Sequence, residues 1–163
     1  MKKGISSISK GQSSGFSLVE IAVVIVVISI LVSISAIGMT IYLKDARDTE
    51  RTTKISIIAE ALEKYYDKNG EYPSCSAVRD NLATVITTLG GIDEDVLRPP
   101  KAELPTGLSC NNGSATPSAD TDIFMYEPLA GSPTDPSQAR SSYQLQYWSE
   151  ADKSITSKQS RRN

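Results

Sequence analysis

An uncharged, apolar stretch near the start of the chain limits the possible folds of this protein more than any other feature. It runs from Ile21 to Leu43, and 18 of its 23 residues are apolar. As a helix it would be about 35 Å long, enough to cross the roughly 30 Å hydrocarbon core of a bilayer. Lys2, Lys3 and Lys10 precede it without an acid among them, and positive charge keeps its end of a span in the cytoplasm. We therefore predict one membrane-spanning helix.

Two simpler interpretations of the same stretch stay open. One is a plain signal-anchor that only tethers the rest of the chain to the membrane. The other is a secretory signal peptide, cleaved at the small-x-small sequence Ser33-Ile34-Ser35 so that the mature chain would begin at Ala36. Against the signal peptide, the apolar run continues past this sequence to Leu43, and an acid, Glu20, stands at its start.

Glu20 is unusual because an acid within a spanning helix costs about 2.5–3.5 kcal/mol at the bilayer centre, and less toward the ends. It either lies hydrated at the interface or has a cationic partner, and the apolar stretch holds no cation. A cut between Gly15 and Phe16 would create an α-amine four residues from Glu20. On a neighbouring chain, such an amine could neutralise the carboxylate and set the register between subunits.

The sequence Gly15-Phe16-Ser17-Leu18-Val19-Glu20 stands between a basic leader and a long apolar run. It resembles the processing site of the type IV pilins and the type II secretion pseudopilins. The resemblance implies that a prepilin peptidase cuts after Gly15 and methylates Phe16, and that Glu20 guides assembly into a filament with bundled apolar helices at its core. Two features differ from the family pattern: the 15-residue leader is long, and Ile37-Gly38 replaces the mid-segment proline of many pilins.

The resemblance implies four segments: a cleaved leader (1–15), a transmembrane and filament-core helix (16–43), its amphipathic continuation (44–70) and a globular head (71–163). The implied partners are the membrane, the prepilin peptidase, an inner-membrane assembly platform and identical or related pilin subunits. The protein would first lie in the cytoplasmic membrane, N-terminus inside, and then join an extracellular type IV pilus for motility, adhesion or DNA uptake. The alternatives are a type II secretion pseudopilin and a membrane-anchored binding module that does not polymerise.

The residues after the apolar stretch are expected to continue the same helix. Residues 44–54 are charged and have no apolar face, which suits an exposed helix or a helix that bridges subunits. Asn69-Gly70 can end the helix with positive φ, and Pro73 bars its continuation. Between these segments the apolar residues recur at helical spacing, namely Ile55, Ile58, Leu62 and Tyr65/Tyr66. One helix from about Phe16 to Asn69 is therefore predicted, and later residues must cover its apolar stripe.

The next part of the chain suggests a second helix and a long loop. Ser74–Leu89 has a helical apolar pattern and ends at Gly90-Gly91, whereas residues 92–121 are acidic and then rich in Pro, Gly, Asn and Ser. The two cysteines of the chain, Cys75 and Cys110, follow the membrane segment, where a disulfide can form. We expect them to be joined; a reactive or metal-binding thiol pair is the alternative.

The last third of the chain has the pattern of strands. Asp122–Glu127 is short and mostly apolar, Ser142–Ser149 alternates apolar and polar residues, and Ser154–Ser160 suits a polar edge strand. A helix, a shorter helix and then strands predict an α+β fold. In this fold, a small antiparallel sheet of three strands packs against the long N-terminal helix, which is the layout of pilins.

The sequence offers little for catalysis or cofactor binding. It has no histidine, the commonest metal ligand and a common general base, no phosphate-binding glycine loop and no zinc-ligand spacing. We expect neither an enzyme nor a resident cofactor. Some major pseudopilins bind calcium, and Asp120, Asp122 and Asp135 are the candidates here, although calcium needs six to eight oxygen ligands. Beyond residue 15, 14 basic residues face 19 acidic ones, which argues against a nucleic-acid partner.

Overall fold

The structure, a computed structural model, describes residues 15–79, 81–102, 108–110, 116–129 and 140–161. The chain has two compact units, Met1–Thr40 and Ile41–Asn163. The helix α1, Leu18–Asn69, contributes to both. With this helix and one small sheet, the protein belongs to the α+β class.

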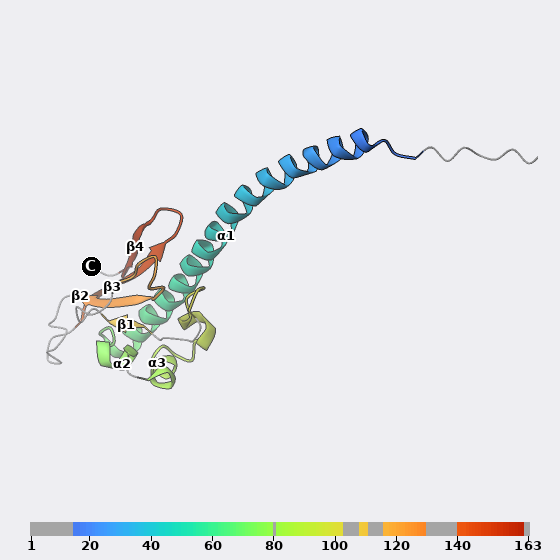
Figure 1. The fold of residues 1–163 in the computed structure, drawn as a ribbon. Coiled ribbons are helices and arrows are strands. Elements are labelled where there is room, and N and C mark those ends of the chain that lie inside the picture. Colours follow the sequence, from blue (N-terminus) through green and yellow to red (C-terminus); the bar gives the residue numbers. More distant parts are fainter. Residues whose placement is uncertain (1–14, 80, 103–107, 111–115, 130–139, 162–163) are drawn as a thin grey trace, which may run out of the picture. The chain divides into compact units, whose positions relative to one another are not determined.

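The second unit contains the end of α1, three short helical segments and four strands (Figure 1). Gly70 follows α1 with φ 77°, and its N–H donates to the Tyr66 carbonyl, so glycine ends the helix as predicted. The helical segments are α2 (Cys75–Arg79), α3 (Leu82–Thr88) and the 3₁₀ turn η1 (Glu94–Leu97). The strands are β1 (Ser109–Cys110), β2 (Met125–Leu129), β3 (Ser142–Ser149) and β4 (Ser154–Gln159).

The sheet has the order β1-β2-β3-β4, with β1 parallel to β2 and the other pairs antiparallel. Figure 1 shows it along one side of the second half of α1. The alternation predicted for Ser142–Ser149 is confirmed, because Tyr143, Leu145 and Tyr147 are buried while the residues between them are half-buried. These side chains cover the predicted stripe of α1, of which Ile55, Ile58 and Leu62 are fully buried.

Three tyrosines close the core between the end of α1 and the sheet. The rings of Tyr72 and Tyr143 meet edge to face with centroids 4.7 Å apart, and Tyr126 lies 6.0 Å from Tyr143. Their hydroxyl groups reach polar partners: Tyr143 donates to the Ala59 carbonyl and Tyr126 to the Pro73 carbonyl. Burial raises the pKa of Tyr126 and Tyr143. Both phenols therefore act as neutral donors that tie the segments together.

Three sequence expectations were wrong in detail. The predicted helix Ser74–Leu89 is two helices, because Asn81 has an extended backbone and its side chain accepts from the Ala83 N–H, which starts α3. The predicted three-stranded sheet has a fourth strand, β1, whose two residues are too few to show a period. The strand expected at Asp122–Glu127 is displaced to Met125–Leu129 and includes Pro128. Proline has no N–H to donate, so it fits a strand only where no neighbouring strand needs that bond. In the described residues β1 pairs only with Met125 and Tyr126, so this side of β2 is an edge at Pro128.

Candidate processing and assembly site

The first described residues form a short non-helical lead into α1. Gly15, Phe16 and Ser17 precede the helix, which begins at Leu18. The N–H of Val19 donates to Ser17 Oγ at 3.3 Å, and the N–H of Ile21 donates to the Ser17 carbonyl at 3.2 Å. Ser17 therefore caps the helix: its hydroxyl accepts from one otherwise free N–H group, and its carbonyl accepts the first i→i−4 bond of the helix. The Gly15–Phe16 peptide lies outside the helical hydrogen-bond ladder.

The predicted cleavage junction is open to solvent. The Phe16 side chain is 79% exposed. A Cβ added to Gly15 would meet no atom within 4 Å, so nothing described in the chain requires glycine at this position. The junction thus has the two physical properties that a peptidase needs, an accessible bond and a backbone outside regular structure.

Glu20 lies in the first turn of α1 and is exposed. A carboxylate there interacts favourably with the helix dipole, typically by 0.3–1 kcal/mol. With Ser17 three residues earlier, the sequence also has the spacing of a capping box. Among the described residues Glu20 has no ion-pair partner. Its position therefore allows two roles, stabilising the start of the helix and offering a charge to another chain.

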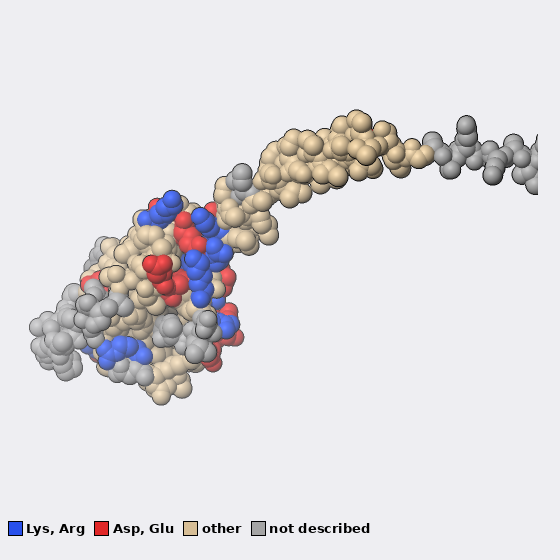
Figure 2. Space-filling view, in the orientation of Figure 1, with Lys and Arg blue, Asp and Glu red and all other residues tan. Residues whose placement is uncertain are grey.

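The apolar part of α1 exposes its side chains on all sides. None of the apolar window is buried, unlike the core helix of a soluble protein. Its serine hydroxyl groups are satisfied within the helix: Ser29, Ser33 and Ser35 donate to the carbonyls of Ile25, Ser29 and Leu31 at 2.7, 2.7 and 2.9 Å. Figure 2 shows this part without visible charge and the charged residues gathered on the rest of the chain. Such a helix suits a single-pass membrane protein, because lipid offers no hydrogen-bond partners.

Residues 44–54 contain a buried cation that the sequence analysis missed. Arg51 is 1% exposed, although the absence of an apolar face in this segment gave no reason to expect burial within the chain. Its guanidinium donates to both carboxylate oxygens of Asp122 at 3.0 and 2.8 Å, to Asp48 at 2.7 Å and to Glu150 at 2.8 Å. Only the Asp48–Arg51 pair, three residues apart on one helix, could have been read from sequence spacing.

Glu150 and Asp48 complete this charged cluster. Glu150 is also paired with Arg47 at 2.7 Å and with Lys101 at 3.1 Å. Hydrogen bonds, first from Arg47 and then from Arg51, hold the pKa of Glu150 well below its usual range against the effect of burial. Burial also opposes ionisation of Asp48, but N–H groups of Ala151 and Glu150 and the Arg51 guanidinium outweigh it and lower the Asp48 pKa. The cluster joins α1 to the turn after β3 and to the segment before β2.

The three calcium candidates do not form a common group among the described residues. Asp120 is exposed, and the Asp122 carboxylate binds Arg51 and accepts the Lys101 N–H at 2.9 Å. Asp135 lies outside the described residues. Within the described ranges, no three acidic or cysteine residues come together as a metal-ligand set. The calcium interpretation stays a prediction without a site.

Cys75 and Cys110 form a disulfide, with Cα atoms 5.7 Å apart. The bond links the start of α2 to β1. Both sulfurs are therefore used, and neither is a free thiol for catalysis or metal binding. The bond closes a loop spanning 35 positions of sequence, which in the chain-entropy description stabilises the folded state by roughly 3–4 kcal/mol.

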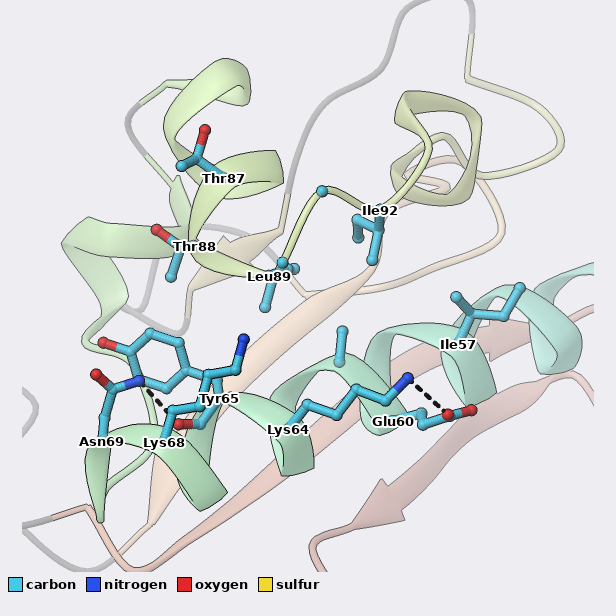
Figure 3. Close-up of a pocket in the computed structure, with 13 residues that line it drawn as sticks. Ile57, Glu60, Lys64, Tyr65, Lys68, Asn69, Thr87, Thr88, Leu89 and Ile92 are labelled. Atoms are coloured by element: carbon cyan, nitrogen blue, oxygen red, sulfur yellow. Dashed lines mark hydrogen bonds and ion pairs between the residues drawn. The ribbon is translucent and has the colours of Figure 1, made fainter.

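A groove of about 420 Å³ lies between α1 and the residues that follow α3 (Figure 3). Ala61 and Leu89 are buried beside it, while Ile57 is exposed. At its rim Lys64 and Glu60 pair at 2.9 Å, so much of the local charge is neutralised. Its other polar lining residues include Tyr65, Lys68 and Thr87.

The processing junction, the exposed helix and Glu20 are thus the candidate functional site of this chain. No protein-family model matches the sequence, and comparison with curated proteins and with solved structures found no match.

Proposed function

We propose that this protein is a structural subunit of a filament, a pilin that a prepilin peptidase processes and that polymerises through its N-terminal helix into an extracellular type IV pilus. The observation that carries the proposal is the arrangement at the start of α1. An accessible, non-helical Gly15–Phe16 bond directly precedes a helix whose apolar side chains are exposed on all sides.

The exposed apolar helix needs a covering before and after assembly. Each large aliphatic side chain taken out of water contributes about 1.5–3 kcal/mol, so the helix from Leu18 to Leu43 would not remain in water. Lipid covers the helix in the membrane. Its serine hydroxyl groups add little free-energy cost there, because they donate to carbonyl groups of the same helix. In a filament, the same surface is covered by the helices of neighbouring subunits. One helix can serve both states because both surroundings are apolar.

Glu20 is the residue that distinguishes assembly from simple anchoring. Once the leader is removed, Phe16 carries the new α-amine, and this amine on a neighbouring subunit is a suitable partner for the carboxylate. In an apolar bundle an unpaired charge is costly, so one register between neighbouring helices would be preferred. The pairing would align the subunits without affecting insertion of the helix into the membrane.

The first test replaces Glu20 in the full-length protein and follows both membrane insertion and filament formation. Glu20→Ala and Glu20→Gln are expected to insert normally and to lose filaments. The glutamine variant separates the two roles, because it keeps the capping-box spacing and loses the charge. Glu60→Gln is the matched control, since Glu60 is an exposed α1 acid whose partner is Lys64. Normal filaments from Glu20→Gln would contradict the charge-pairing role.

The second test identifies the N-terminus of the mature protein by mass spectrometry. A chain that begins at Phe16, with one methyl group on its α-amine, is expected. A chain beginning at Ala36 would mean a secretory signal peptide, and an intact Met1 would mean a plain anchor. Electron microscopy of producing cells then separates a long surface pilus from the short periplasmic filament of a type II secretion pseudopilin.

A further inference from the structure

The last strand, β4, lies at the edge of the sheet and contributes no buried side chain to the core. Its residues alternate between exposed and half-buried, and Ile155 is 46% exposed. By contrast, every second residue of its neighbour β3 is buried. The apolar burial that secures β3 is therefore missing from β4, whose attachment depends on its backbone pairing with β3 and on polar contacts.

Several polar contacts of the turn that leads into β4 meet at one place on α1. Asp48 accepts the N–H groups of Glu150 and Ala151 at 3.1 and 2.8 Å and the Ser149 hydroxyl at 3.1 Å. The Glu150 carboxylate is held by Arg51 and Arg47. The turn between β3 and β4 is thus fixed to the helix by an acid that binds backbone N–H groups and by ion pairs.

The backbone of the turn between β3 and β4 is also in an unfavourable conformation. Lys153, the residue before β4, has φ 51°, which is unfavourable for a side chain other than glycine, asparagine or aspartate. At the other end of β4, Lys158 donates to Ser56 Oγ at 3.0 Å, and the Arg161 N–H donates to Glu63 at 3.1 Å. These contacts are polar as well, so water can replace each of them when the strand separates from α1.

From these contacts we propose that β4 is a releasable strap. Asp48, Arg51 and Glu150 form its latch on α1, and when the latch opens β4 leaves β3 while the core stays folded. β3 stays in place because β2 pairs with its other edge and because Tyr143, Leu145 and Tyr147 remain buried. Release would expose the second hydrogen-bonding edge of β3, a row of N–H and C=O groups free to pair with another strand.

Hydrogen exchange followed by mass spectrometry tests this proposal on the full-length protein in detergent at pH 7. In Asp48→Ala, the β4 amides bonded to β3 are expected to exchange at least on the order of tenfold faster, because the hydrogen bonds of Asp48 with two backbone N–H groups, the Ser149 hydroxyl and the Arg51 guanidinium are all lost. The amides of β2 and of residues 55–62 of α1 should remain better protected than those of β4, because they exchange only when the whole unit unfolds. Glu60→Gln, which removes an α1 ion pair outside the latch, is the matched control and should leave β4 protected.

Two results would overturn the proposal. One is equal protection of β4, β2 and residues 55–62 of α1, with the same urea dependence, which would mean that the strand opens only when the whole unit unfolds. The other is β4 protection in Asp48→Ala equal to that in Glu60→Gln. If Asp48→Ala does not fold, exchange of the wild-type protein at low urea decides the question. Separate opening of β4 with little urea dependence supports the strap, and opening together with the core contradicts it.

Discussion

Replacing Arg51 by methionine tests whether the charged cluster stabilises the second unit as its geometry indicates. Methionine has a long, flexible side chain that can fill most of the space, so the change removes the charge and the donors with little loss of volume. Arg51 donates four hydrogen bonds to the carboxylates of Asp48, Asp122 and Glu150. Without it, Asp122 keeps only the Lys101 N–H bond among these contacts, whereas Glu150 keeps Arg47 and Lys101.

The magnitude follows from the burial of Arg51 and of its partners. The side chain of Arg51 is 1% exposed, and those of Asp122 and Glu150 are 8% exposed. Removing one partner from a buried ion pair typically costs about 3–5 kcal/mol, because the remaining charge is left desolvated and uncompensated. A domain of ordinary stability has about 5–15 kcal/mol. Arg51→Met should therefore remove a large fraction of the free energy of unfolding.

Urea unfolding measures this loss, with fluorescence of the single Trp148 as the probe in β3. Lys64→Met is the control, since it makes the same change at an ion pair whose lysine is 69% exposed. An exposed pair of this kind contributes at most about 1 kcal/mol. In the Arg51→Met background, Asp122→Asn should recover part of the loss by removing an unpaired charge. Equal stability of Arg51→Met and Lys64→Met would refute the reasoning.

Further predictions concern pH, the disulfide and the core. The lowered pKa values of Glu150 and Asp48 mean that their stabilisation is complete above the ordinary values of 4.5 and 3.8 and is lost as pH falls below them. The free energy of unfolding from urea titrations should therefore be lower at pH 3 than at pH 7, and equal values would contradict the assignment. Replacing Cys75 and Cys110 by alanine should lower the free energy of unfolding by roughly 3–4 kcal/mol, and a difference below about 1 kcal/mol by the same measurement would refute the entropic account. Leu62→Ala should cost about 2–5 kcal/mol, and a thermal midpoint equal to that of the wild type would show that the site is not a packed core.

The elements that could be predicted have a local pattern in the sequence. The helix was expected to end at Asn69, and it does, because Gly70 can adopt a positive φ. A strand was expected at Ser142–Ser149, and β3 has those bounds, because alternation records which face meets the core. The candidate processing site at Gly15, Phe16 and Glu20 rests on a resemblance to a family motif and stays a prediction.

The elements that could not be predicted depend on contacts between distant residues. Arg51 lies in a segment without an apolar face, and only folding brings Asp122 and Glu150, 71 and 99 positions away, to its guanidinium. In the same way β1 is a strand only because Ser109 and Cys110 lie beside β2.

Periodicity and charge along the chain thus determined the long helix, its apolar half, its end and the main strands, because backbone geometry imposes these patterns on neighbouring residues. The tertiary structure decided which charged residues are buried, how the last strand is held to the helix and how the predicted second helix divides. These outcomes depend on which distant partners can compensate a desolvated charge or an unpaired backbone group, and no local pattern records them.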